Sequence, residues 1–130
     1  MEVKISVGKK GLLSLGDNFT ISAESSLVCQ KEIFFGDSCL LSWDILVMDT
    51  DFHEILNMSD EIINEPSSIR IGNHVWIGCR TLILKGISIG DNNVIAANST
   101  ITKSIKDTNC VCYCSGKNQE ILRRDITWRS

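Results

Sequence analysis

In the second half of the chain an isoleucine recurs at every sixth position, and this period constrains the fold more than any other feature. The residues concerned are Ile71, Ile77, Ile83, Ile89, Ile95 and Ile101. A six-residue period matches neither the 3.6-residue turn of an α-helix nor the two-residue alternation of a simple strand. It does match a short strand followed by a corner, repeated three times per coil, with one aliphatic side chain of each unit pointing inward.

The same spacing is present upstream, with a change of phase. It runs through Leu15, Ile21, Leu27 and Ile33, and resumes two residues later in Phe35, Leu41 and Val47. Glycine often follows the periodic residue, with Asp or Asn after it, and these residue types favour turns. Coils of this kind stack, so that the inward side chains form one continuous core. The sequence therefore predicts an all-β fold, a single-stranded parallel β-helix of about five coils, in one domain over residues 1–130.

Two segments break the period. Residues 49–68 have no six-residue register, carry several acidic residues and contain the chain's only proline. We expect a loop that protrudes from the solenoid, and loops of this length are usually functional or disordered. Near the end of the chain, Ile121, Leu122 and Ile126 are spaced as on one face of a helix. This spacing predicts a short C-terminal helix that covers the last coil.

Composition excludes several classes of protein. A net charge of −3 and a pI near 5.3 argue against binding to nucleic acid, because phosphates require a surplus of basic residues. No apolar run approaches the ~20 residues of a transmembrane segment, and the N-terminus lacks the apolar core of a signal peptide. We expect a cytoplasmic protein. The six cysteines include no CxxC pair and only two histidines are present, so no metal is expected. Buried, reduced thiols are favoured, with a metal or redox site at Cys110, Cys112 and Cys114 as the alternative.

The protruding loop contains the run Asp49-Thr50-Asp51-Phe52-His53-Glu54. A neighbouring carboxylate can orient a histidine and make it more basic, which suits a general base near neutral pH. On these residues alone, a solvated surface histidine is the alternative. The chain has no nucleophile elbow, P-loop or dinucleotide-binding fingerprint that would favour another mechanism.

The stretch Ile71–Lys103, with its Val-Trp-Ile-Gly corner and its final Ile-Thr-Lys, resembles the signature of the hexapeptide-repeat acyltransferases. The resemblance covers about Leu15 to Leu122. Members of this family include maltose and galactoside O-acetyltransferases and enzymes that decorate polysaccharides, and the run from Trp43 to His53 is most similar to the polysaccharide-modifying subgroup. The resemblance implies a left-handed β-helix, an exception to the usual crossover hand. It also implies a homotrimer with sites between subunits and acetyl-CoA as the acyl donor.

The resemblance implies roles for single residues as well. His53 matches the general base, and Trp76 matches a tryptophan that lines the site. The acidic residues Asp49 and Asp51 are expected at the mouth of the site, where the acceptor enters, and His74 is expected at its periphery. Contacts with the cofactor are expected from Cys79, Ala97, Thr102, Lys103 and Lys117, and Arg123 and Arg124 are further candidates for contacts with its phosphates.

The predicted function is an acetyl-CoA-dependent O-acetyltransferase that acts on a hydroxyl of a sugar or polysaccharide precursor. N-acetylation of an amino sugar is an alternative, because the same base can activate an amine. A non-catalytic β-helix that serves as an interaction module is another. A γ-type carbonic anhydrase shares the solenoid but needs three histidines to bind zinc. This chain has only His53 and His74, so its ligand set is incomplete. The stretch Cys114–Gln119 departs from the family's Gly-Asn-Pro-Ala, so the contacts near the adenine stay open, as does the identity of the acceptor.

Overall fold

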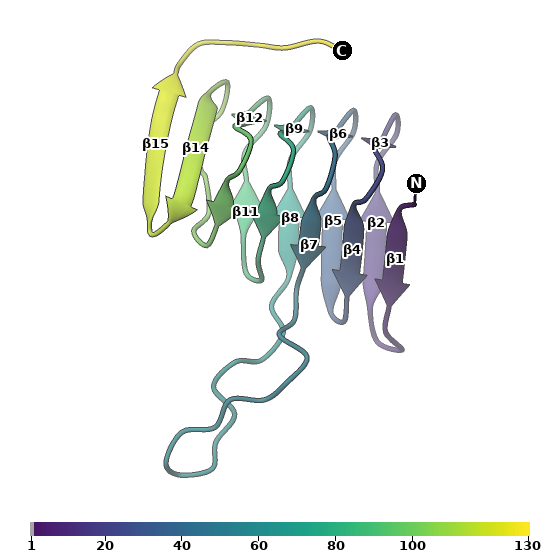
Figure 1. The fold of residues 1–130 in the computed structure, drawn as a ribbon, viewed down its shortest axis with the longest axis vertical. Coiled ribbons are helices and arrows are strands. Elements are labelled where there is room, and N and C mark those ends of the chain that lie inside the picture. Colours follow the sequence, from purple (N-terminus) through teal and green to yellow (C-terminus); the bar gives the residue numbers. More distant parts are fainter. Residues whose placement is uncertain (1) are drawn as a thin grey trace.

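The computed structural model describes residues 2–130, which form a parallel β-helix of about five coils (Figure 1). Each of the first four coils contributes three short strands, and the fifth ends in a hairpin. The strands are β1 (Lys4–Val7), β2 (Leu12–Leu15), β3 (Thr20–Ile21), β4 (Ser26–Cys29), β5 (Glu32–Phe35), β6 (Leu40–Leu41), β7 (Leu46–Met48), β8 (Ile69–Ile71), β9 (Trp76–Ile77), β10 (Leu82–Ile83), β11 (Ser88–Ile89), β12 (Val94–Ile95), β13 (Thr100–Ile101), β14 (Val111–Gly116) and β15 (Asn118–Arg123).

The strands stack into three faces. Face 1 consists of β1, β4, β7, β10 and β13, face 2 of β2, β5, β8 and β11, and face 3 of β3, β6, β9 and β12. Neighbouring strands on a face are parallel and in register, so that Ile83 pairs with Val47 on one side and Ile101 on the other. This architecture agrees with the left-handed β-helix that the family resemblance implies.

The periodic residues form the core, as predicted. The six periodic isoleucines of the second half are all buried, and each residue is at most 3% exposed. The change of phase upstream has a simple cause: β5 is long enough to point both Ile33 and Phe35 inward. Ile33 continues the upstream frame, and Phe35 starts the frame that leads through Leu41 to Val47. Two inward positions on one strand therefore move the six-residue period by two residues without disturbing the core.

The Gly-Asp and Gly-Asn motifs form the corner between face 2 and face 3. There a side-chain oxygen of each coil accepts a hydrogen bond from a backbone N–H of the preceding coil, for example from Asp37 to Asn73 Oδ1 at 2.8 Å. The same contact joins Asp17 to Asp37 and Asn73 to Asp91. One position in each of these corners has a left-handed backbone, with φ between 54° and 59°: Asn18, Ser38, His74, Asn92 and Asn109. This explains the Asn-rich corners, since Asn tolerates that conformation.

The C-terminal end of the solenoid differs from the prediction. No helix covers the last coil; β14 and β15 form an antiparallel hairpin. The first half of β14 pairs with β12 and its second half with β13, so this strand closes the coil and leaves a free edge. The prediction of a capping helix was wrong because a strand can satisfy the backbone groups of that edge and a helix cannot. In β15, Ile121 packs on the core while Leu122 is exposed, which is the alternation of a strand.

The loop of residues 49–68 protrudes from the solenoid between β7 and β8, as predicted (Figure 1). It leaves the corner between face 1 and face 2. Its two ends are joined by a hydrogen bond from Ser67 N to the Asp49 carbonyl at 3.0 Å, and the Ser67 carbonyl accepts from Gly86 N of the next coil. The loop therefore starts from a fixed base. None of residues 2–130 lies in a helix long and apolar enough to cross a bilayer.

Candidate functional site

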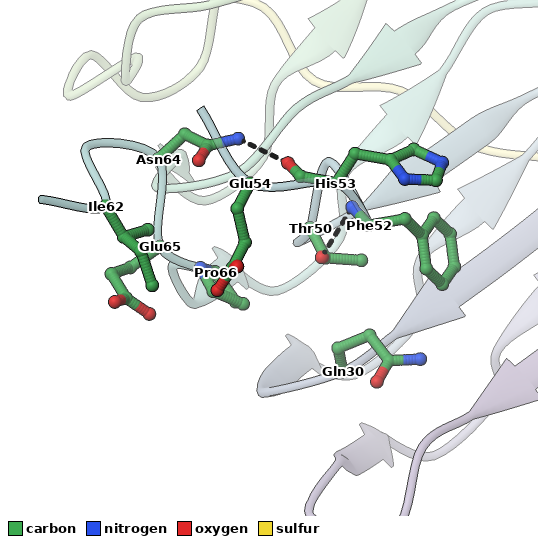
Figure 2. A pocket seen from close by; sticks show the side chains of 9 residues that line it. All are labelled: Gln30, Thr50, Phe52, His53, Glu54, Ile62, Asn64, Glu65 and Pro66. Carbon is green, nitrogen blue, oxygen red and sulfur yellow. Dashed lines mark hydrogen bonds between the residues drawn. The ribbon is translucent and has the colours of Figure 1, made fainter. Parts of the chain in front are cut away.

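His53 lies at a pocket that the protruding loop forms by folding back on itself (Figure 2). Both limbs of the loop line this pocket, together with one residue from the corner of the preceding coil, and its volume is about 220 Å³. The rings of His53 and Phe52 project from the same side of the loop. The lining residues are Gln30, Thr50, Phe52, His53, Glu54, Ile62, Asn64, Glu65 and Pro66.

The backbone of His53 is held on both sides. Its N–H donates to the Asp51 carbonyl at 2.7 Å, and its carbonyl accepts from Asn64 Nδ2 at 2.8 Å. Phe52, just before it, adopts a left-handed backbone with φ of 63°, and its N–H donates to Thr50 Oγ1 at 3.0 Å. Residues 50–53 therefore form a tight turn that fixes the direction in which the His53 side chain leaves the loop.

The Asp51 carboxylate does not orient the imidazole. It accepts hydrogen bonds from Lys85 Nζ at 2.7 Å and from Asn64 Nδ2 at 3.0 Å. These bonds, chiefly that from Lys85, hold the pKa of the Asp51 carboxyl below its ordinary value. The carboxylate is therefore ionised at neutral pH, and its Oδ2 atom accepts both hydrogen bonds. The sequence does not predict that Asn64 and Lys85 contact Asp51, because these residues lie 13 and 34 positions away from it.

Asp49, expected at the mouth of the site, lies beneath the loop instead. Its side chain is fully buried. The carboxylate accepts three backbone hydrogen bonds of 2.8 Å each, from the N–H groups of Gln30, Lys31 and Glu32. Asp49 therefore stabilises the corner between β4 and β5. Its buried carboxylate oxygens are not accessible to a substrate.

Three predicted site residues meet at another corner, between face 3 and face 1. Trp76, Cys79 and Ala97 line one apolar groove with a volume of about 350 Å³. Trp43 lines the same groove, and this residue is 60% exposed. The Trp76 indole is held by a hydrogen bond from Nε1 to Ser42 Oγ at 3.1 Å. The close approach of the coils here requires glycine at position 78, since a Cβ would lie 2.6 Å from the Ile95 carbonyl oxygen.

The predicted contacts to the cofactor's phosphates divide into two groups. Thr102 Oγ1 donates to the Gly116 carbonyl at 2.8 Å, and Gln119 Nε2 donates to the Lys103 carbonyl at 2.8 Å. These bonds place Thr102 and Lys103 beside the β14–β15 turn, which contains Lys117. Arg123 ends β15 at the far end of the hairpin, roughly 20 Å from that turn at ~3.3 Å per residue. Next to it, Arg124 pairs with Asp107 at 3.0 Å.

His74 lies at the corner between face 2 and face 3, away from His53. Its ring stacks on Trp128, with centroids 3.9 Å apart and planes 6° from parallel. Its Nδ1 is 2.8 Å from Asn92 Oδ1, and its carbonyl accepts from Trp128 Nε1. His74 therefore fastens the C-terminal tail to the solenoid. Across residues 2–130, no three or more His, Cys, Asp or Glu side chains gather in a way that would hold a metal ion.

The two parts of the candidate site occupy different corners of one chain. The His53 pocket adjoins the corner between faces 1 and 2, whereas the Trp76 groove follows the corner between faces 3 and 1. Face 1 separates them, and one side of a coil spans about six residues, which corresponds to roughly 20 Å. A single chain therefore presents a candidate base and an apolar groove that do not face each other.

Comparison with known proteins supports the interpretation of the repeat. The family described as bacterial transferase hexapeptide (six repeats) matches residues 68–103. A galactoside O-acetyltransferase of Escherichia coli K12 is 35% identical over 95 residues, which cover 72% of this chain and 46% of that protein. The chain thus spans about half the length of this relative.

Solved structures share the fold over almost the whole chain. The polySia-specific acetyltransferase NeuO superposes with a TM-score of 0.78 and 28% identity, covering 98% of this chain and 51% of that one. A hexapeptide-repeat acetyltransferase of Vibrio cholerae, solved in complex with acetyl-CoA, superposes with a TM-score of 0.75 and 25% identity, covering 94% and 64%. With the repeat, the coils and these relatives in agreement, the chain belongs to the hexapeptide-repeat acyltransferase family.

Proposed function

We propose that the protein is an acetyl-CoA-dependent O-acetyltransferase that acts on a hydroxyl of a sugar or polysaccharide precursor. The observation that carries the proposal is the convergence of Trp76, Cys79 and Ala97 on one apolar groove. An apolar, uncharged groove suits the pantetheine arm and the thioester of acetyl-CoA. Lys103 and Lys117, near the β14–β15 turn, suit the phosphates of its nucleotide. The solved relative with acetyl-CoA and the sugar acetyltransferases among the relatives support the same function.

In the proposed mechanism, the His53 imidazole accepts the proton of the acceptor hydroxyl. The hydroxyl oxygen then attacks the carbonyl carbon of the thioester, a C–O bond forms, and the C–S bond breaks. The imidazolium returns the proton to the departing thiolate, so that the products are the acetyl ester and free CoA thiol. General base catalysis of this kind contributes about 10²- to 10⁴-fold to the rate.

The proposed active enzyme is a homotrimer in which the loop of one subunit faces the groove of its neighbour. The support for this arrangement is the separation of His53 from the Trp76 groove within one chain, across face 1. Three copies around an axis give three equivalent sites, and a closed ring of this kind is a common form of oligomer. The trimer would therefore bring together what one chain keeps apart.

A cytoplasmic location is part of the proposal, because all six cysteines are free thiols, as is usual in a reducing compartment. The relatives act on acceptors as different as galactosides and polysialic acid according to their names, so the proposed acceptor class is a glycan hydroxyl. N-acetylation of an amino sugar is the second candidate. Glu54 and Glu65 line the His53 pocket, and their carboxylates would attract an amine.

The test combines binding and turnover. Acetyl-CoA is titrated by calorimetry into the wild-type protein and into His53→Ala, and both are assayed for thiol release with neutral, amino and acidic sugars. We expect equal binding of acetyl-CoA, and a loss of turnover of about 10²- to 10⁴-fold in the variant. A wild-type protein that does not bind acetyl-CoA would contradict the proposal and favour the non-catalytic module. An amide product instead of an ester would establish the second candidate.

A further inference from the structure

We propose that Asn64, Asp51 and Lys85 form a positioning unit that holds His53 in place through its main chain. The proposal rests on the proposed function of His53 as the base. A carboxylate hydrogen-bonded to the imidazole is the usual way to orient such a histidine. Among the described residues 2–130, no hydrogen bond joins the Asp51 carboxylate to the imidazole, and Asp51 Oδ2 accepts from Lys85 and Asn64 instead. The structure therefore points to a different way of holding His53.

Asn64 is the centre of this unit. Its Nδ2 donates both to Asp51 Oδ2 at 3.0 Å and to the His53 carbonyl at 2.8 Å, the second of which is drawn in Figure 2. Its Oδ1 accepts from Ile55 N at 2.6 Å. A side-chain amide offers two donor hydrogens and one acceptor oxygen, and all are used. Asn64 lies on the returning limb of the loop, so these bonds fasten it to the outgoing limb on both sides of His53.

Lys85 connects the loop to the solenoid. It belongs to the corner between β10 and β11, one coil beyond the coil from which the loop leaves. Its Nζ donates to Asp51 Oδ2 at 2.7 Å and to the Asn64 carbonyl at 3.2 Å. Only 26% of the Lys85 side chain is exposed, and hydrogen bonds between ionised groups are stronger than neutral ones. The rigid coil thereby holds both limbs of the loop.

The positive charge of Lys85 suits it to hold the Asp51 carboxylate, because the loop itself is acidic. Residues 49–68 contain six Asp and Glu residues and no Lys or Arg, so the loop cannot form such an ion pair internally. A base displaced by about 1 Å can lose on the order of 10²-fold in rate. A long loop without regular strands needs a fixed point near the base, and Lys85 supplies it through Asp51 and Asn64.

The first test compares two asparagines of the same loop. Asn64→Ala removes the bonds around His53. Asn57→Ala is the matched control, because Asn57 joins the tip of the loop through Ser59 N, Glu61 N and the Glu61 carboxylate. We expect Asn64→Ala to lower kcat about 10- to 100-fold. KM for acetyl-CoA should stay unchanged, because none of the bonds of the Asn64 side chain involves a residue of the apolar groove. Asn57→Ala should keep kcat within about twofold of wild type, since it leaves the base in place.

The second test uses conservative rescue. Lys85→Met should lower kcat as Asn64→Ala does, whereas Lys85→Arg should keep most of it, because the guanidinium can still donate to Asp51. Exchange of the two charges, Asp51→Lys with Lys85→Asp, should recover part of the loss of each single variant. If substitutions at position 85 acted only by unfolding the protein, Lys85→Met and Lys85→Arg would lower kcat to the same extent. A higher kcat in Lys85→Arg therefore separates a positioning role from a general effect on stability.

Two results would overturn the proposal. One is wild-type kcat in both Asn64→Ala and Lys85→Met. The other is a fall in kcat accompanied by an equal loss of acetyl-CoA binding. If the wild-type protein transfers no acetyl group, the proposed function fails and the unit is judged by hydrogen exchange of the amides of residues 51–55. Faster exchange in Asn64→Ala than in Asn57→Ala would still support the unit, and equal exchange would refute it.

Discussion

The solenoid and the protruding loop are built on opposite principles. In the solenoid each inward side chain stacks on an equivalent one a coil away, as Ile83 does between Val47 and Ile101. The same contact recurs along every face. In the loop each contact occurs once, as in the bonds from Asn64 to Asp51 and His53. Because its contacts repeat, the solenoid is stable and can be predicted from the sequence. The contacts of the loop do not repeat, and they fix the position of His53.

The largest effect should come from a charge inside the solenoid. Ile77 is fully buried on face 3, and Ile77→Asp would leave an unpaired carboxylate in the core. We expect a loss of about 4 kcal/mol or more in the free energy of unfolding, enough to unfold a marginal protein. Ile63→Asp, on the exposed part of the loop, should change it by about 0.5 kcal/mol or less. Urea unfolding followed by circular dichroism measures both, and equal losses would contradict the distinction between the two regions.

Two aspartates at the start of the loop should separate stability from activity. Asp49→Ala removes the acceptor of three backbone N–H groups and should cost about 3 kcal/mol in unfolding free energy. Asp51→Ala breaks only the exposed contacts with Lys85 and Asn64, so it should lower kcat with little change in the thermal midpoint. Calorimetric melting and the acetyl-transfer assay, run on both variants, measure the two effects. A larger loss of stability in Asp51→Ala would reverse the assignment.

Alkaline pH should weaken the solenoid through the cysteines of the last coil. Burial, and then the neighbouring Cys110 and Cys114, raise the pKa of the Cys112 thiol from 9.0 to about 12. A raised pKa stabilises the folded state fully below the unfolded value, and this contribution is lost as pH rises from about 9 towards the folded value. Urea unfolding should therefore show decreasing stability over that window. Cys112→Val, which cannot ionise, should show a shallower decrease, and an identical slope would exclude Cys112 as the cause.

Acid should loosen the loop with the smallest effect on overall stability. The pKa of Asp51 is lowered chiefly by the hydrogen bond from Lys85. Its contribution is therefore present above the ordinary pKa of an aspartate and is lost as pH falls through the lowered, folded value. Hydrogen exchange of residues 51–55, corrected for the intrinsic effect of pH, should report loosening only in strong acid. In Lys85→Met the same loosening should begin at higher pH.

The wrong prediction of a C-terminal helix shows that a short local pattern does not by itself determine secondary structure. Ile121, Leu122 and Ile126 have helical spacing, yet residues 118–123 form a strand. Only the folded chain reveals that β14 leaves an open edge beside them, and pairing with this edge decides the outcome. Ile126 then donates its N–H to the Asn109 carbonyl as the tail returns along the coils. Tertiary pairing here overrides a short local pattern.

The candidate site was predictable to the extent that it belongs to the repeat or to the family signature. Trp76 in β9 and Cys79 at the corner after it belong to one coil, and Ala97 occupies the position equivalent to Cys79 in the next coil. The register of the coils therefore brings all three to one groove. His53 follows from its acidic loop together with the family resemblance. The anchors Asn64 and Lys85 were not predictable, because nothing in the sequence indicates which polar side chains the returning limb and the next coil place beside Asp51.

The sequence by itself determined the solenoid, its core and the place where the loop leaves it. The physical reason is that each coil buries its side chains against the next at a fixed spacing, so the contacts are written in the sequence as a period. The tertiary structure alone decided that Asp49 supports a corner, that Asp51 is tied to Lys85, and that the last coil ends in a hairpin. Those contacts join segments that are far apart in the sequence and meet only after folding. Each of these contacts occurs only once, so it produces no periodic pattern in the sequence.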